Sequence, residues 1–390
     1  MYARPLATLL ILLALPAGAA TDDSLAALGR ALFFDTNLSA RRTQSCASCH
    51  DPAHAFADPR DNGVGGAVSP GDDGVSRGTR NAPSIAYAAA VPAFARDATG
   101  TPRGGFFHDG RAQTLAAQAA EPLTNPREMA LPDTAAVLAR VRENPAYVSA
   151  FEEAFGAGVL DDAGRGMDAI TRALAAFEHG APFVAFDSRY DRFLAGELEL
   201  TIEEELGRRL FFSDLTNCMA CHLEEPGRVK QREAFTDHRY HNIGVPAHPL
   251  LRATEPDRGL AANPAVDDAD AVGRFRTPTL RNVAVTAPYM HNGVFAHLAT
   301  ALAFYNQYVV RNDQVGINPE TGQAWGERPY AHTIERDRLG QGQPLDATRI
   351  RHLTAFLRAL TDRRYEHLLP AWETHDAPGH GAEEEEPRHE

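Results

Sequence analysis

Apolar residues recur with the 3.6-residue period of an α-helix in several parts of the chain. The clearest example is segment 346–361, for which Asp346 is a suitable N-cap. Its apolar face carries Ile350, Leu353, Phe356, Leu357 and Leu360. Segments 133–143 and 164–178 follow the same period, whereas the alternation of apolar and polar residues that is typical of β-strands is scarce. The pattern predicts a mostly α-helical protein.

Two long segments, 62–83 and 313–345, are rich in Gly and Pro and follow neither period. Because glycine and proline interrupt regular elements, we expect loops there. Loops of this length inside a folded domain usually serve a function.

The chain also contains an internal repeat. Residues 29–34 read GRALFF and residues 207–212 read GRRLFF. Farther along, residues 108–110 (HDG) match residues 291–293 (HNG), and a leucine follows each at the same distance. Two duplicated units are therefore expected.

The composition narrows the class of protein. The 390 residues are 44% hydrophobic and 23% charged, as in ordinary globular proteins, which excludes disorder of the whole chain. The net charge is −14 and Lys230 is the single lysine, so the chain offers no basic stripe and nucleic acid is excluded as a partner. Segment 375–390 is acidic with three histidines; we expect a disordered tail, with loose metal binding as the alternative.

The first twenty residues have the pattern of an export signal. Arg4 precedes the apolar run 6–15, and Pro16 and small residues follow at 17–20. The run is too short to span a bilayer, and no other stretch approaches that length. We expect segment 1–20 to be cleaved and the mature chain, without a membrane span, to be periplasmic; a short buried helix is the alternative.

All four cysteines fall in one motif that occurs twice. Residues 46–50 read CASCH and residues 218–222 read CMACH, which is the C-x-x-C-H pattern of covalent haem c attachment. A thioredoxin-like pair or half of a zinc site is the alternative, but neither requires the histidine or explains the recurrence. The cysteines assigned to thioether bonds are Cys46, Cys49, Cys218 and Cys221, and the histidines assigned to iron are His50 and His222.

The repeat and the two motifs together predict two cytochrome c-like helical domains, each carrying one covalent haem c. We expect an N-terminal haem domain over 21–190 and a C-terminal haem domain over 191–374, which meet near residues 180–200.

The repeat also indicates whether each iron has a second protein ligand, opposite the motif histidine. At one position, fourteen residues after the histidine of the repeat, the second half has Tyr305 and the first half has Pro122. A tyrosine oxygen can ligate iron, whereas proline cannot. We expect an open, five-coordinate haem on His50 and a six-coordinate haem between His222 and Tyr305. The alternative for Tyr305 is a plain core aromatic.

The two motifs, together with four further segments, resemble the bacterial dihaem cytochrome c peroxidase family over about residues 24–368. The four segments are 81–83 (NAP), 118–129, 277–282 (TPTLRN) and 288–293 (PYMHNG). Peroxidases proper in that family use methionine as the distal ligand of the second haem. Tyr305 is instead similar to the MauG-like branch, which includes methanobactin-associated enzymes that oxidise a protein tryptophan. Members of that branch use hydrogen peroxide to form high-valent iron and oxidise a residue of a partner protein.

The resemblance implies further site residues. Gln118, Pro122 and Glu128 match the distal pocket of the peroxidatic haem, in which the carboxylate acts as general acid and base. The alternative for Glu128 is a solvated surface carboxylate. The residues that match a calcium site between the haems, for which metal-free turn residues are the alternative, are Asn81, Thr286 and Pro288.

This sequence departs from the family at two places. The peroxidases carry a distal histidine after the first motif that is lost on reductive activation, whereas here only His54 lies in that loop, too near the motif to reach the iron. We therefore expect an enzyme that needs no activation. Many relatives also have tryptophan between the haems, where this chain has His108, so transfer between the haems is expected to use another route.

Three functions remain open at this point. The first is MauG-like oxidation of a protein residue, with tryptophan as the first candidate. The second is a cytochrome c peroxidase that takes electrons from a small c-type cytochrome, which the acidic surface would suit if that donor is basic. The third is a plain electron carrier with both irons capped.

Overall fold

The computed structural model describes residues 22–225, 228, 230, 232–251, 255–310 and 316–371. The export signal predicted at 1–20 and the tail predicted at 375–390 lie outside these residues. Within them, no helix is both long enough and apolar enough to cross a bilayer.

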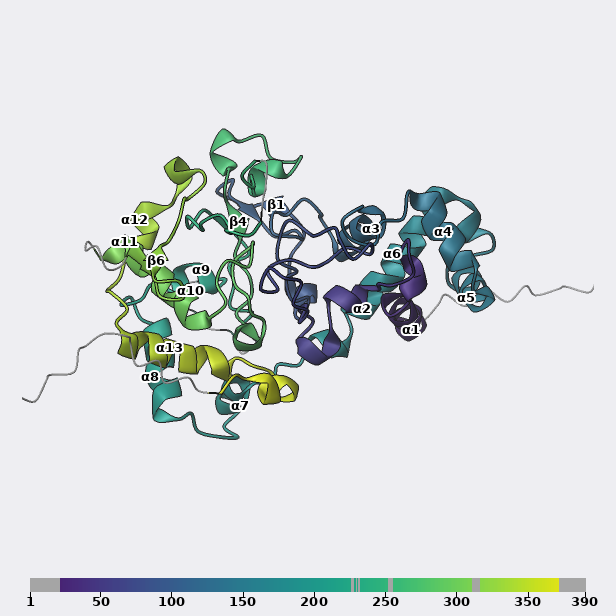
Figure 1. The fold of residues 1–390 in the computed structure, drawn as a ribbon. Coiled ribbons are helices and arrows are strands. Elements are labelled where there is room, and N and C mark those ends of the chain that lie inside the picture. The colour runs from purple at the N-terminus through teal and green to yellow at the C-terminus, as the bar shows by residue number, and fades with distance from the viewer. Residues whose placement is uncertain are drawn as a thin grey trace, which may run out of the picture.

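The described chain is mostly α-helical, as predicted (Figure 1). The helices are α1 (Asp22–Phe33), α2 (Cys46–Cys49), α3 (Leu115–Thr124), α4 (Thr134–Arg142), α5 (Pro145–Phe155), α6 (Ala163–Glu178), α7 (Arg189–Leu194), α8 (Ile202–Phe211), α9 (Met219–His222), α10 (Leu298–Phe304), α11 (Asn306–Val309), α12 (Arg336–Leu339) and α13 (Ala347–Ala359). The strands form three antiparallel pairs, β1 (Ala95–Arg96) with β2 (Pro102–Arg103), β3 (Tyr240–His241) with β4 (Phe275–Arg276), and β5 (Ile317–Asn318) with β6 (Gln323–Ala324).

The three helices expected from periodicity are present as α4, α6 and α13. The carboxylate of Asp346 accepts a hydrogen bond from the backbone N–H of Arg349, so the predicted N-cap of α13 is confirmed. One loop prediction is wrong in part. Segment 313–345, of which the structure describes 316–345, contains the β5–β6 hairpin and α12. These elements are only two to four residues long, too short to leave a period in the sequence.

The internal repeat folds into the same helix pair twice. In the first half α1 packs on α6, and in the second half α8 packs on α13. A glycine sits at each crossing, because a Cβ on Gly29 would lie 1.8 Å from the Ala173 carbonyl oxygen and a Cβ on Gly207 would lie 1.8 Å from that of His352. The repeated glycine therefore lets each pair of backbones approach closely.

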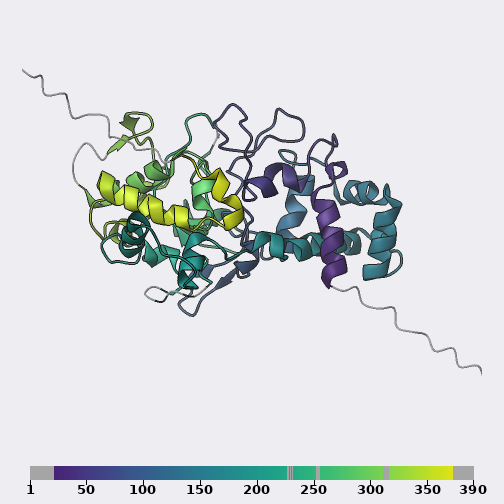
Figure 2. The same ribbon diagram turned by 90° about the horizontal axis from the view of Figure 1, so that it is seen from below.

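Two hydrophobic cores correspond to the two halves of the chain, which form two lobes in Figures 1 and 2. The first core ends at Phe183 and the second begins at Tyr190, close to the expected meeting point of the domains. The lobes touch where the Tyr365 hydroxyl donates to the Pro52 carbonyl oxygen at 3.0 Å. The β1–β2 hairpin also reaches the second half, through a bridge between Arg103 and Arg239.

Glu178, the last residue of α6, has a buried carboxyl group whose effect on stability can be tested. Its side chain is buried, and among the residues described its Oε2 atom has no hydrogen-bond partner. Burial raises the pKa of this carboxyl group from 4.5 to about 8. Between these pH values the folded state holds a proton that the unfolded chain releases, so stability falls as pH rises from 4.5 to 8.

We expect Glu178→Gln to remove this pH dependence. Because each unit of pKa shift corresponds to about 1.36 kcal/mol, the substitution should stabilise the protein by a few kcal/mol at pH 8 and by little at pH 4.5. Thermal unfolding of the holoprotein across this range measures the effect. Glu153→Gln, at an exposed position of α5, is the control. Parallel melting curves for wild type and Glu178→Gln at both ends of the range would contradict the assignment.

Candidate haem and peroxide site

A single cavity of about 1470 Å³ runs between the two lobes and reaches both C-x-x-C-H motifs. This volume exceeds the roughly 300–1,000 Å³ of a pocket for one small molecule. The residues expected at the site that line the cavity are Cys49, His50, Asn81, Gln118, Pro122, Glu128, Cys218, Cys221, His222, Thr286, Pro288 and Tyr305. Cys46 instead packs against the first core. The structure thus brings both halves of the expected site together.

Each motif histidine is oriented by a backbone carbonyl. The Nδ1 atom of His50 lies 3.3 Å from the carbonyl oxygen of Phe56, and the Nδ1 atom of His222 lies 3.1 Å from that of Phe235. Burial lowers the pKa of both imidazoles, so they are neutral and Nδ1 carries the proton. The lone pair is then on Nε2, which is the arrangement that a metal ligand needs.

The two phenylalanines were missed in the sequence, although a signal was present. Residues 55–58 read AFAD and residues 234–237 read AFTD, one after each haem motif. Phe56 and Phe235 both have φ of 55°, a left-handed conformation that is rare for an aromatic residue. This conformation turns each carbonyl toward its histidine.

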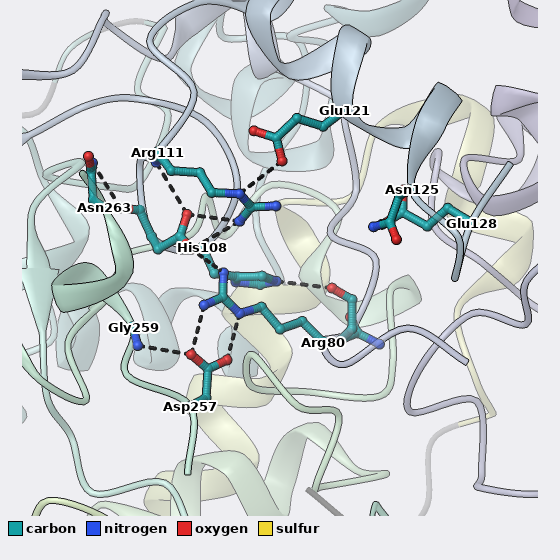
Figure 3. Close-up of polar contacts among 11 residues, drawn as sticks. Arg80, His108, Arg111, Glu121, Asn125, Glu128, Asp257, Gly259 and Asn263 are labelled. Carbon is teal, nitrogen blue, oxygen red and sulfur yellow. Dashed lines mark hydrogen bonds and ion pairs between the residues drawn. The ribbon is translucent and has the colours of Figure 1, made fainter. Parts of the chain in front are cut away.

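Gln118, Pro122 and Glu128, which belong to the first half of the chain, line the cavity. Glu128 accepts a hydrogen bond from the side-chain amide of Asn125 at 2.8 Å, and these two side chains lie near each other in Figure 3. Burial raises the pKa of Glu128, an effect that the positive charge of Arg111 partly offsets. A half-buried carboxyl group with a raised pKa is suited to proton transfer near neutral pH.

Tyr305 lines the cavity on the side of the second motif. It follows α10, and Pro122 lies within α3, at matching distances from the starts of the two helices at Leu298 and Leu115. Burial raises the pKa of the Tyr305 phenol. A phenolate at this position therefore requires a strong cation as partner, which a ferric ion would provide.

A network of charged groups joins the lobes (Figure 3). Arg80 forms ion pairs with Asp109 at 2.7 Å and with Asp257 at 2.6 Å. His108 lies beside this network, with Nε2 at 3.0 Å from the Asn81 carbonyl oxygen. Burial, reinforced by the charge of Arg80, lowers the pKa of His108 to about 4. His108 is therefore neutral, donates to the Asn81 carbonyl oxygen and lines the cavity.

The three residues expected to hold calcium come from two distant segments of the chain. Asn81 contacts the second lobe, because its backbone N–H donates to the His291 carbonyl oxygen at 2.8 Å. Its side-chain amide donates to the Ala67 carbonyl oxygen at 3.1 Å. Thr286 and Pro288 line the same cavity.

His54 lies away from the cavity. Its Nδ1 atom pairs with the Asp51 carboxylate at 2.7 Å, and 43% of its side chain is exposed. His54 therefore does not reach the cavity that the haem motifs line.

The cavity contains buried donors that a haem could satisfy. In the part of the chain that the structure describes, Nε of Arg276 and Nδ1 of His238 are buried and lack hydrogen-bond partners, and both residues line the cavity. Burial lowers the pKa of Arg276, and no described carboxylate pairs with it. Burying a cation without a partner costs free energy, so an anion is expected to bind beside Arg276. The propionates of a haem supply such carboxylates, so the residues present fit the group.

A second charged cluster lies beside the second motif. His241 bonds to Asp237 through Nε2 at 3.0 Å and to Glu335 through Nδ1 at 2.9 Å. Burial favours a neutral ring, but the bonds to Asp237 and Glu335 outweigh it and raise the pKa of His241. Asp237, His241 and Cys221 are close enough to hold a metal ion. Since Cys221 belongs to the haem motif, the cluster supports that motif with fixed charge.

Comparison with known proteins agrees with this geometry. A family model described as di-haem cytochrome c peroxidase matches residues 23–199. The chain is 52% identical to the methylamine utilization protein MauG of Paracoccus denitrificans over 354 residues, 89% of this chain and 91% of that protein. It is 30% identical to the cytochrome c551 peroxidase of Nitrosomonas europaea over 296 residues, 74% of this chain and 75% of that protein.

Among solved structures, the diheme peroxidase BthA from Burkholderia thailandensis superposes with a TM-score of 0.80 at 33% identity, covering 91% of this chain and 92% of that one. Both the sequence and the fold are thus shared over most of the chain. The chain therefore belongs to the di-haem cytochrome c peroxidase and MauG family of haem-dependent oxidoreductases, which implies two haem c groups.

Proposed function

We propose that the enzyme acts in the periplasm and uses hydrogen peroxide to oxidise a tryptophan residue of a partner protein. The main support for this proposal is that the two halves have different residues at one equivalent position of the repeat. Pro122, whose side chain cannot ligate iron, lines the cavity in the first half, whereas Tyr305, whose phenol can, lines it in the second half. The similarity to a methylamine utilization protein MauG favours the same function.

The first pocket prepares the reaction with peroxide. Haem iron, when bound there, supplies the two-electron chemistry that cleaves the peroxide O–O bond. Glu128 takes a proton from one peroxide oxygen and delivers it to the leaving oxygen, as its raised pKa allows. Gln118 and Pro122 shape the pocket beside it. His50, neutral and oriented by the Phe56 carbonyl oxygen, would ligate this iron through Nε2.

The second pocket is suited to store oxidising equivalents. Tyr305 and His222 would ligate the iron here, and an anionic phenolate favours the higher oxidation states of iron more than a thioether does. Tyr305 therefore sets the direction of electron flow, from the partner protein toward peroxide.

The proposal is tested with the holoenzyme, hydrogen peroxide and a small exported protein encoded beside this one. Mass spectrometry of that protein should show oxidation at tryptophan that requires both enzyme and peroxide. A high-spin ferric signal in the resting enzyme is also expected, because one iron has an open face. Two saturated low-spin centres would contradict the proposal.

The second candidate function is a cytochrome c peroxidase, which the 30% identity to a cytochrome c551 peroxidase favours. Steady-state peroxide turnover with a reduced small c-type cytochrome separates the two functions. The rate is high for a peroxidase and low for an enzyme that oxidises a protein residue.

We further propose that Asn81, Thr286 and Pro288 hold a calcium ion through oxygen atoms. Removal of calcium with EGTA should change the haem spectrum and slow the reaction with peroxide, because the site joins both lobes between the haems. Added Ca²⁺ should restore both properties. Asn81→Ala should weaken calcium binding, and Asn81→Asp should retain it. Metal analysis that finds no calcium, together with an enzyme indifferent to EGTA, would exclude the site.

A further inference from the structure

The sequence alone assigns no function to segment 313–345, which contains the β5–β6 hairpin. In residues 321–327 every position is exposed except Trp325, whose relative exposure is 6%. Trp325 points into a cluster with Phe295, Ala301 and Phe304. A surface segment thus buries a single side chain, and that side chain is an indole.

Trp325 lies one ring away from the proposed iron ligand. The ring centroids of Trp325 and Phe304 are 5.2 Å apart, and those of Phe304 and Tyr305 are 6.1 Å apart. Both contacts are edge-to-face, with interplanar angles of 82° and 74°. The three rings form a continuous path from the cavity to the hairpin.

The hairpin is tied to the helix that carries this path. Glu320, in the turn of the hairpin, accepts hydrogen bonds from the backbone N–H groups of His297 at 2.7 Å and Ala296 at 3.1 Å. These groups lie at the start of α10, which ends at Phe304. The hairpin is bound at the start of α10, and Tyr305 follows directly after its end. The helix therefore holds Trp325 and Tyr305 in place relative to each other.

The first half of the repeat lacks this path. The position equivalent to Phe304 is Glu121, directly before Pro122 as Phe304 is before Tyr305. Glu121 is exposed and pairs with Arg111 at 3.0 Å. The two halves thus diverge at two neighbouring positions, with Glu121 and Pro122 in the first half and Phe304 and Tyr305 in the second.

We propose that Trp325 is the point at which oxidising equivalents leave the second haem for the protein surface. This inference rests on the proposed function, which supplies peroxide as the oxidant. The Trp325 indole gives one electron through Phe304 and Tyr305 toward the second haem site and regains one electron from the partner residue. Two such transfers balance the two-electron reduction of hydrogen peroxide to water. No covalent bond forms or breaks at the indole, which keeps its N–H proton.

Indole and phenol are the side chains most easily oxidised after thiols, whereas benzene rings are not oxidised under these conditions. Trp325 is the single tryptophan among the residues that the structure describes. Phe304 therefore serves as a bridge for the electron and Trp325 as a stopping point. Packing alone would make Trp325 an ordinary core residue, and the two roles differ in their response to peroxide.

The test uses the holoenzyme with hydrogen peroxide alone, so that it does not depend on a partner protein. Without a partner protein to reduce the oxidised indole, we expect in the wild type a tryptophan radical in freeze-quench EPR, identified by indole deuteration. Loss of a second electron and addition of water should then give hydroxylated Trp325 in peptide mass spectrometry. In Trp325→Phe, which keeps a ring in the cluster, the radical should vanish. The peroxide-induced change in haem absorbance should then decay about tenfold more slowly.

Phe295→Leu is the matched control, because Phe295 contacts Trp325 at 5.4 Å but lies off the path to Tyr305. It should loosen the same cluster and leave the radical and the decay rate unchanged. Wild-type enzyme that reacts with peroxide without oxidising Trp325, or Trp325→Phe that decays at the wild-type rate, would overturn the inference. Trp325 oxidation without oxidation of any partner protein would support the exit and reject the proposed function instead.

Discussion

Glu128→Gln is expected to slow the reaction of the resting enzyme with hydrogen peroxide by about 100- to 1,000-fold, within the range that general acid–base catalysis contributes. Glutamine keeps the size of the side chain and the contact with Asn125 but cannot carry a proton between the two peroxide oxygens. Stopped-flow absorbance of the haem groups after mixing with peroxide measures the rate.

The control for this prediction is Glu121→Gln. Glu121 is partly exposed, pairs with Arg111 and does not line the cavity, so its loss removes a nearby negative charge without touching the pocket. Glu121→Gln should react at close to the wild-type rate. If both variants react equally fast, Glu128 is only a structural carboxylate.

Tyr305→Phe is expected to lower the rate of oxidation of the partner protein at least about 100-fold. This factor corresponds to about 2.7 kcal/mol of activation free energy. The phenyl ring preserves the packing against Phe304 but offers no oxygen to iron, so the second haem loses the ligand that favours its oxidised state. The absorption and EPR spectra of the second haem should change in the resting enzyme. Consumption of peroxide at the first haem should continue.

Tyr308→Phe provides the comparison for this variant. Tyr308 lies three residues farther along, donates its hydroxyl to the Ile243 carbonyl oxygen at 2.7 Å, and does not line the cavity. Its removal should cost some stability and leave the haem spectra unchanged. Full partner oxidation with an unchanged spectrum in Tyr305→Phe would reject the proposed ligand.

The arrangement of the site explains why the two halves of a duplicated protein could acquire different tasks. The helix pairs α1–α6 and α8–α13 keep the same glycine-mediated crossing, and Phe56 and Phe235 orient the two motif histidines in the same way. The halves differ at neighbouring positions of the repeat, where Pro122 lines the cavity in the first half and Tyr305 lines it in the second. Stability and chemistry thus depend on separate residues.

Much of this could be predicted from the sequence because the signals are local. A C-x-x-C-H motif, a helical period or an N-cap such as Asp346 involves residues within a few turns of one another, so their order along the chain is itself the evidence. The repeat added one long-range statement, that Pro122 and Tyr305 occupy equivalent positions.

The tertiary structure alone decided which distant segments meet. The ion pairs of Arg80 with both Asp109 and Asp257 and the ring path to Trp325 join residues from separate parts of the chain. The buried Nε of Arg276 and Nδ1 of His238, which have no partner among the described residues, were also visible only in the fold. Burial also set the pKa of Glu178 and Glu128, since the free energy of a charge depends on the solvent that the fold excludes. Residue order encodes local geometry, but desolvation and contacts between distant segments exist only once the chain has folded.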